Sequence, residues 1–285
     1  MHIPVLKKEA LQYLDPKPNE SFIDCTISEG GHTTAILEKN KPNGKVLGIE
    51  LDKDIFDKLS LSQTERLILV NDSYVNLKEI VKKSKFTSIN GILFDLGMSS
   101  WHLEESGRGF TFLKDEPLDM RYSLENDLTA EEIVNNYSQK EIEKILEEYG
   151  EERFAKRIAK RIIQTRHRKI KSTFQLIEII KKAVPRKRTK IHPATRTFQA
   201  LRIAVNDELN NLEKALFQAA EILEKDGRIV IISFHSLEDR IVKNFFKDSN
   251  LKILTKKPVI PSQEEIKINR RSRSAKLRAA TKVRT

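Results

Sequence analysis

The chain contains 285 residues, of which 33% are charged and 39% hydrophobic, and it carries a formal net charge of +11. This length is enough for one large or two ordinary domains with a buried core. No apolar run approaches the roughly 18 residues of a membrane span, and the first residues lack the apolar segment of a secretory signal peptide. The single cysteine, Cys25, excludes an internal disulfide and a thiolate metal cage. We therefore expect a cytoplasmic protein with neither a metal site nor a membrane partner.

The positive charge permits a polyanionic partner, because Lys and Arg that neutralise phosphates release condensed counterions. The charge is unevenly distributed: +8 of the +11 falls in the last 19 residues, from Lys267 onward, which contain no acid. Net charge alone leaves a nucleic-acid ligand and a lysine-rich solvated surface equally open.

The first hundred residues alternate short apolar runs with amphipathic stretches. Strands that are apolar on both faces and separated by helices are typical of parallel sheets with right-handed crossovers. The predicted strands span residues 21–26, 46–50, 67–70 and 89–95, and the predicted helices span 33–39, 52–61 and 75–82.

This alternation stops at about Glu104, and no further apolar strand is predicted before Thr195. The pattern indicates a helical insertion. Capping boxes beginning at Thr129 and Ser138 mark helix starts, and two more helices are predicted at 151–167 and 172–184.

The alternation then resumes with one long predicted helix at 196–224, a strand at 228–234, a helix at 237–246 and strands at 251–254 and 275–281. Seven strands are the number in a class I (Rossmann-like) S-adenosylmethionine methyltransferase sheet, so we predict an α/β fold of that class with an inserted helical domain. The predicted division is a first core part at 1–103, a substrate-recognition insertion at 104–195, and a second core part with a basic C-terminal tail at 196–285.

Three segments follow predicted parallel strands, where open α/β sheets bind their ligands. The first carries Gly30 and Gly31, which have no Cβ and let a ligand approach the backbone. The second is Glu50, whose carboxylate can accept hydrogen bonds from ribose hydroxyls. The third runs from Asp95 to Ser100 and combines a carboxylate, a glycine and two hydroxyls. Each segment alone is also compatible with an ordinary turn or cap, but together they indicate a nucleoside cofactor.

S-adenosylmethionine fits these segments better than NAD does. The loop is not GxGxxG, the sequence that places a pyrophosphate on a helix N-terminus. Asp24 and Glu29 would repel a pyrophosphate but tolerate the cationic amino group and sulfonium of S-adenosylmethionine.

Eight motifs, in order and covering about residues 3 to 280, resemble the ribosomal RNA small subunit methyltransferase H family, also called MraW. They are Asp24–His32, Asp95–Ser100, Arg108–Phe112, Pro117–Arg121, Tyr149–Ala155, His192–Arg202, Ser233–Arg240 and Arg271–Arg278. The resemblance implies S-adenosylmethionine-dependent methylation of the exocyclic N4 of a decoding-centre cytosine in 16S ribosomal RNA. Its implied partner is that RNA, in the small subunit or an assembly intermediate. It implies no oligomeric state.

The resemblance also implies a set of cofactor contacts, namely Gly30, Gly31, His32, Glu50, Tyr74, Asp95 and His102. Three positions depart from the family pattern. Ser28 stands where glycine is usual and must avoid a positive φ or carry strain, Glu50 replaces Asp, and Trp101-His102 replaces a Pro-Gln pair.

For the chemistry, the predicted proton acceptor is Asp95, supported by the Ser99 hydroxyl. Trp101 and Phe110 are candidates to hold an unstacked base, with core packing as the alternative. His235 is expected to line the site or to be a structural histidine. Four residues at the edges of the insertion orient the target or join the domains: Asp119, Arg121, His192 and Arg196.

RNA contacts are predicted in basic runs. No acid falls between Arg153 and Gln175, and Arg153, Arg157 and Lys160 recur at helical spacing. Further runs are 166–171, 186–190 and the tail at 270–284, which includes Arg271 and Arg273. The alternative is a solvated helix face.

Three other functions stay open at this point. A methyltransferase acting on DNA amino groups is disfavoured because the sequence has no Asn/Asp-Pro-Pro-aromatic loop. The others are a non-catalytic ribosome-assembly factor that retains the fold, and an NAD dehydrogenase.

Overall fold

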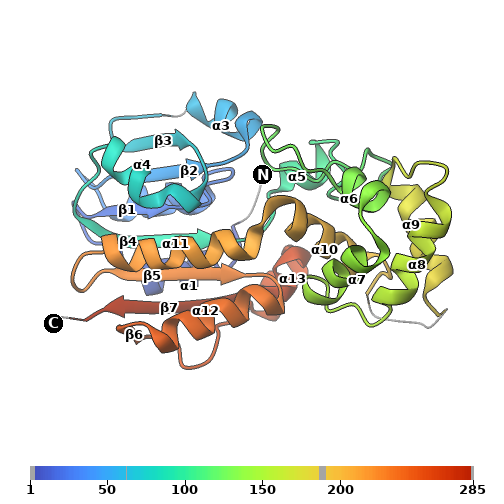
Figure 1. The fold of residues 1–285 in the computed structure, drawn as a ribbon. Helices are drawn as coiled ribbons and strands as arrows, with labels where there is room; N and C mark the ends of the chain where they lie inside the picture. Colours follow the sequence, from blue (N-terminus) through green and yellow to red (C-terminus); the bar gives the residue numbers. More distant parts are fainter. Residues whose placement is uncertain (1–3, 62, 186–190, 284–285) are drawn as a thin grey trace. The chain divides into compact units, whose positions relative to one another are not determined.

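The computed structural model describes residues 4–61, 63–185 and 191–283, which form two compact units. One unit, the sheet unit, consists of the residues up to 97 together with those from 209. The other, the helical unit, consists of residues 98–208. Figure 1 shows the chain coloured in sequence order.

The sheet unit is built on seven strands in the order β3-β2-β1-β4-β5-β7-β6. The first five are parallel, and β7 runs antiparallel to both β5 and β6. The predicted seven-stranded α/β sheet is thus confirmed. The strands are β1 (Ser21–Asp24), β2 (Val46–Glu50), β3 (Leu67–Asn71), β4 (Ile89–Asp95), β5 (Arg228–Ser233), β6 (Leu251–Ile253) and β7 (Lys276–Lys282).

The register places the strand ends that carry predicted site residues at one edge of the sheet. Asp24, Glu50 and Asp95 are the last residues of β1, β2 and β4, and Asp95 pairs with Ile232 near the end of β5. Because β7 is antiparallel, its first residue, Lys276, pairs with Ser233. The start of β7 therefore lies at the edge where the parallel strands end.

Helices cover both faces of this sheet (Figure 1). One core packs the side chains of α4, α11 and α12 on the sheet, and the other packs those of α1 and α2. The helices of the unit are α1 (Lys7–Leu14), α2 (Gly31–Lys39), α3 (Lys53–Ser60), α4 (Leu77–Lys83), α11 (Glu208–Ile222), α12 (Ser236–Asp248) and α13 (Gln263–Ile268), with short 3-10 helices η1 (Tyr74–Asn76) and η2 (Arg270–Ser274).

The helical unit surrounds a core of its own, formed by the apolar faces of its longer helices. In α8, Ile158, Ala159 and Ile162 are buried, while Arg157 and Lys160 are exposed. Both predicted helix starts are confirmed, but only Ser138 forms the full predicted capping box, whereas Thr129 only accepts from the Glu132 N–H. The helices are α5 (Ser100–Glu104), α6 (Ala130–Asn136), α7 (Gln139–Glu148), α8 (Ala155–Thr165), α9 (Thr173–Ala183) and α10 (Thr195–Asn206).

The structure corrects two predictions: the single helix at 196–224 and the boundaries between the two units. The stretch predicted as one helix is two, α10 and α11, because Asp207 between them has φ 49°, in the left-handed region. The units divide after residues 97 and 208, not after 103 and 195. The reason is that α10 buries Phe198, Ala200 and Leu201 in the core of the helical unit.

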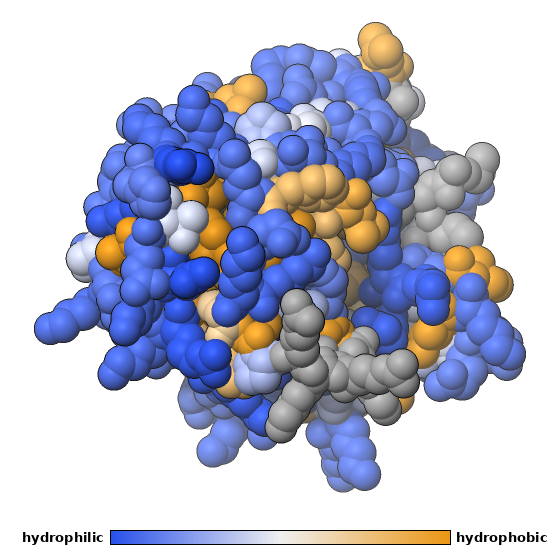
Figure 2. Space-filling model, turned by 90° about the vertical axis from the view of Figure 1, so that its right-hand side faces the viewer, coloured by the Kyte–Doolittle hydropathy of each residue, from blue (hydrophilic) through white to orange (hydrophobic). Residues whose placement is uncertain are grey.

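The basic C-terminal segment is folded up to residue 283, in agreement with the strand predicted at 275–281. Its residues form η2 and then β7, whose Leu277, Ala279 and Ala280 are buried in the sheet. Within the described part of the chain, no helix is both long and apolar enough to span a bilayer. The face drawn in Figure 2 is mostly hydrophilic, with small hydrophobic patches.

Candidate active site

The loop from β1 into α2 is anchored by buried polar groups. Asp24 is buried and accepts hydrogen bonds from the Thr33 hydroxyl (2.7 Å) and the Thr26 N–H (3.2 Å). Burial raises the pKa of this carboxyl, although the Thr33 hydrogen bond acts against the shift. The residue therefore serves first to hold the loop.

The two glycines of this loop have different roles. Gly30 has φ 76° and begins α2 in a conformation that favours glycine. Gly31 lacks space for a side chain because a Cβ would lie 2.3 Å from Cγ of Pro4. Protein packing therefore already explains Gly31. Ser28, at φ 51°, carries the strain that the sequence predicted for a non-glycine residue there.

Glu50 is buried at the end of β2. Its two carboxylate oxygens accept from the Ser28 N–H (3.0 Å) and the Asp52 N–H (2.9 Å). Burial raises the pKa of Glu50 to about 7, despite these two hydrogen bonds. The carboxylate thus links the strand end to the first loop and can change charge near neutral pH.

Asp95 and His32 face each other at the end of β4. The Asp95 N–H donates to Thr26 Oγ1 (2.7 Å), and His32 Nε2 lies 3.5 Å from Asp95 Oδ2. That separation is an ion-pair contact but outside hydrogen-bond geometry. Burial lowers the pKa of His32, but the carboxylates of Asp95 and Asp24 outweigh burial and the pKa is raised overall.

Three buried polar atoms in these loops have no hydrogen-bond partner among the described residues: Ser28 Oγ, His32 Nε2 and Asp95 Oδ1. Buried polar atoms are normally paired, so an unpaired group of this kind fits a polar ligand. The carboxylates of Asp24, Glu50 and Asp95 favour the amino and sulfonium cations of S-adenosylmethionine over a pyrophosphate. The residues present therefore fit this cofactor.

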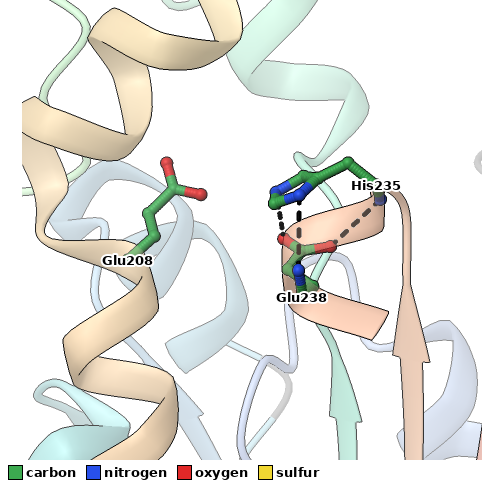
Figure 3. Close-up of side chains that lie close together, drawn as sticks. All are labelled: Glu208, His235 and Glu238. Carbon is green, nitrogen blue, oxygen red and sulfur yellow. Dashed lines mark hydrogen bonds and ion pairs between the residues drawn. The ribbon is translucent and has the colours of Figure 1, made fainter. Parts of the chain in front are cut away.

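Two further predicted residues belong to the same unit. Tyr74 is in η1 after β3, and its ring meets that of Phe94 edge-on at 5.8 Å. His235 caps α12, since its Nδ1 accepts from the Glu238 N–H (3.4 Å) and Glu238 Oε2 accepts from the His235 N–H (3.4 Å; Figure 3). The same oxygen accepts from the Phe234 N–H (2.8 Å). The His235 Nε2 lies 3.0 Å from Glu238 Oε1, at ion-pair distance but off the hydrogen-bonding direction.

The predicted residues Ser99, Trp101, His102 and Phe110 lie in the helical unit. Ser99 caps α5, and its Oγ lies 2.8 Å from His102 Nδ1. The His102 ring is buried against Trp101, Phe110 and Tyr122. The Ser99 hydroxyl is therefore occupied within its own unit.

The structure favours core packing for Phe110. The ring is 5% exposed and stacks on Tyr122 at 5.2 Å, so the prediction that it holds a base needs correction. Trp101 is partly exposed and lies under the Arg108 guanidinium (5.1 Å to the ring centre).

Asp119 and Arg121 pair with each other. The Arg121 guanidinium donates to both Asp119 oxygens (2.9 and 2.8 Å) and to the carbonyls of Leu124 and Asn126. The adjacent guanidinium lowers the pKa of Asp119 in spite of burial. These contacts tie residues 119–126 together within the helical unit.

The basic residues are placed where RNA could reach them. Arg153 and Lys160 are exposed, as is Arg157, which lies over the Phe154 ring, and so are Arg271 and Arg273 in η2. His192 and Arg196 line a pocket with Arg153. The predicted run at 186–190 lies outside the described residues.

Sequence reasoning missed Thr26, which fixes the Asp95 backbone, and Asp239. The Asp239 carboxylate accepts from Arg278 Nε (2.7 Å) and Lys276 Nζ (3.0 Å) on β7. Both residues lie inside the family motifs, but spacing alone does not reveal partners that are 69 residues away for Thr26 and 37 or 39 residues away for Asp239.

The strand order, the antiparallel seventh strand and the carboxylates at the ends of β1, β2 and β4 are those of a class I methyltransferase. The chain belongs to the MraW methylase family, whose model matches residues 1–283. This membership confirms the predicted cofactor, S-adenosylmethionine.

Full-length relatives agree with this assignment. The chain is 49% identical to ribosomal RNA small subunit methyltransferase H of Thermosipho melanesiensis, over 99% of this chain and 98% of that protein. It is 47% identical to the proteins of the same name from Dictyoglomus thermophilum (98% and 95% coverage) and Thermosipho africanus (99% and 98%).

Proposed function

We propose that this methyltransferase modifies the exocyclic N4 of a decoding-centre cytosine in 16S ribosomal RNA, in the small subunit or an assembly intermediate. The observation that carries the proposal is the buried Asp95 Oδ1 at the end of β4, which has no hydrogen-bond partner among the described residues. The relatives of this chain are named as ribosomal RNA methyltransferases. Such a substrate would place the protein in the cytoplasm.

The cofactor supplies an activated methyl group when bound. The residues at the ends of β1, β2 and β4 would hold the cofactor, whose methyl group would pass to N4 while the sulfur kept the electron pair of the C–S bond. The cytosine amine must then lose one proton. Asp95 is suited to accept it because its Oδ1 has no other described partner, whereas the Ser99 hydroxyl is engaged with His102.

Other residues have supporting roles in this proposal. Glu50 binds the ribose hydroxyls, and Tyr74 and His32 complete the part of the cofactor site that the sheet unit provides. The exposed cations of α8 and η2 contact RNA phosphates, and Trp101 is the candidate for stacking on the target base.

Radiolabelled methyl transfer tests the function. Purified small subunits, naked 16S RNA and duplex DNA are each incubated with the protein and labelled S-adenosylmethionine, and the nucleosides are then separated. We expect label in N4-methylcytidine from RNA. Label in DNA, in another nucleoside, or binding to small subunits without transfer would each contradict the proposal.

The Asp95→Asn variant tests the proton acceptor. It keeps the shape of the side chain, so we expect cofactor binding within a few-fold of wild type and a turnover loss of about 10²–10⁴-fold. Asp57→Asn, an exposed carboxyl on α3, is the matched control. Unchanged turnover in the Asp95 variant would remove this residue from the chemistry.

A further inference from the structure

A pocket of about 360 Å³ lies entirely within the helical unit, a volume typical of small-molecule sites. Three separate segments line it: the approach to α8, the end of α9 and the turn before α10. Its charged and aromatic lining residues are Glu152, Arg153, Phe154, His192 and Arg196, and its remaining walls are Val184, Pro185, Ile191 and Pro193.

His192 presents a flat, uncharged ring to this pocket. The Phe112 ring, which is not part of the lining, stacks on the His192 ring with 4.7 Å between the ring centroids and 10° between the planes. The His192 Nδ1 accepts from the Ala194 N–H (3.3 Å), which leaves the proton of the neutral imidazole on Nε2. Burial, with a contribution from Lys181, lowers the pKa of His192 and favours the neutral form. A neutral ring held in this way is a platform for stacking a nucleobase.

Two guanidinium groups at the pocket suit a phosphate. Arg153 makes no described hydrogen bond, and Arg196 uses only Nη1, which donates to the Glu151 carbonyl (2.9 Å) in the described part of the chain. Glu152 is the one acid among the described residues of the lining. Its Oε1 accepts from the Phe154 N–H (2.9 Å), and its other oxygen remains available to the N–H groups that every nucleobase carries.

The helix starts at the pocket also favour an anion. α8 and α10 both begin there without a side-chain cap and without an acid in the first turn, and each has arginine there instead. Cations at the positive end of a helix are unfavourable unless an anion compensates them.

We propose that this pocket holds one unstacked nucleotide of the RNA substrate, with its base on His192 and its phosphate paired with Arg153 and Arg196. The inference rests on the proposed function in taking RNA as the ligand. It adds a specific nucleotide site to the general electrostatic attraction of the basic surface.

The test measures binding of the full-length protein to a labelled single-stranded 12-nucleotide RNA and to a matched ribose-phosphate oligomer without bases. His192→Ala should weaken binding of the RNA about 10-fold and leave the baseless oligomer within about 2-fold. Arg153→Ala should weaken both to a similar extent and reduce the slope of log K against log salt by about 0.7.

Two variants guard against loss of folding and non-specific charge effects. His192→Phe keeps a stacking ring and should bind the RNA within about 2-fold of wild type. Lys140→Ala removes an exposed cation of α7 outside the pocket and should change neither affinity by more than that. Equal losses for both oligomers in His192→Ala, or no loss, would overturn the proposal.

The same preparations separate this inference from the proposed function. If wild type transfers no methyl group to small subunits but shows the base-dependent effect of His192, the function fails and the pocket stands. If methyl transfer is normal and the pocket variants bind both oligomers like wild type, the pocket alone is refuted.

Discussion

Ser28 combines backbone strain with a polar atom that has no described partner. Its φ of 51° costs a residue with a Cβ about 1 kcal/mol or more, and its buried Oγ adds to that cost. Ser28→Gly should therefore stabilise the cofactor-free protein by about 0.5–1 kcal/mol and raise Tm by a few degrees.

The same substitution should weaken S-adenosylmethionine binding several-fold if Ser28 Oγ contacts the cofactor. Calorimetry on the two proteins measures both effects. Ser60→Gly, at the end of α3, provides a control with helical backbone, and it should lower stability slightly without affecting the cofactor. A Ser28→Gly variant that is less stable than wild type would contradict the proposed backbone strain at this position.

Glu50 should make cofactor binding depend on pH. Its pKa of about 7 means that it is half protonated near neutrality, and a protonated carboxyl is a weaker acceptor for ribose hydroxyls. We expect the affinity for S-adenosylmethionine to fall below pH 7, by up to about tenfold per pH unit. Glu50→Gln should bind weakly with little pH dependence between 5 and 8, and a pH profile in this variant like that of wild type would assign the effect to another group.

Glu50 affects folding stability in the opposite direction: cofactor affinity rises with pH, whereas the free energy of unfolding falls. The folded protein holds the Glu50 proton more tightly than the unfolded chain, so raising the pH from about 4.5 to 7 destabilises wild type relative to Glu50→Gln. The size is at most about 3 kcal/mol. Denaturant titrations of both proteins across that range measure the difference.

At the scale of elements, Asp239 joins α12 to β7. Both of its partners lie on β7, and they lower its pKa despite partial burial. Asp239→Asn should cost about 1.5–3 kcal/mol near neutral pH, because Arg278 is only 11% exposed and loses a charged acceptor.

The depressed pKa of Asp239 also fixes the pH range of this effect. The stabilisation is present above the unfolded-state pKa and disappears as the pH falls through the lower folded-state value. Asp248→Asn, on the exposed part of α12, should change stability by less than about 0.5 kcal/mol. A cost for Asp239→Asn that persists in strong acid would point to lost packing instead.

Elements with strong local signals could be predicted, whereas those set by tertiary contacts could not. Buried strands such as Val46–Glu50 and the starts of capped helices such as α7 were predicted to within one or two residues because apolar runs and caps are local. The break at Asp207 and the burial of α10 depend on the core that this helix meets. The site shows the same contrast: strand-end acids follow from the pattern, but the pairing of Ser99 with His102 does not.

At the scale of the whole molecule, folding engages part of the C-terminal positive charge in contacts within the protein. Of the basic residues from Lys267 onward, Lys276 and Arg278 both pair with the single carboxylate of Asp239, and Lys282 Nζ donates to three carbonyls at the end of α11. The exposed cations that precede β7 are Lys267, Arg270, Arg271 and Arg273. The part of this surplus available to RNA therefore lies just before β7, at the edge where the parallel strands end.

This location predicts a position-dependent effect of charge on RNA binding. Removing two cations with Arg270→Gln and Arg273→Gln should lower the affinity for 16S RNA and reduce the slope of log K against log salt by about 1.4, as expected for two lost phosphate contacts. Lys39→Gln with Lys45→Gln removes the same charge from exposed positions, and Lys45 directly precedes β2 at the opposite edge of the sheet. Because both pairs change the net charge equally, filter binding between 50 and 300 mM salt should show a smaller slope only for the η2 pair. Equal slopes in the two double variants would mean that RNA responds to total charge and not to this edge.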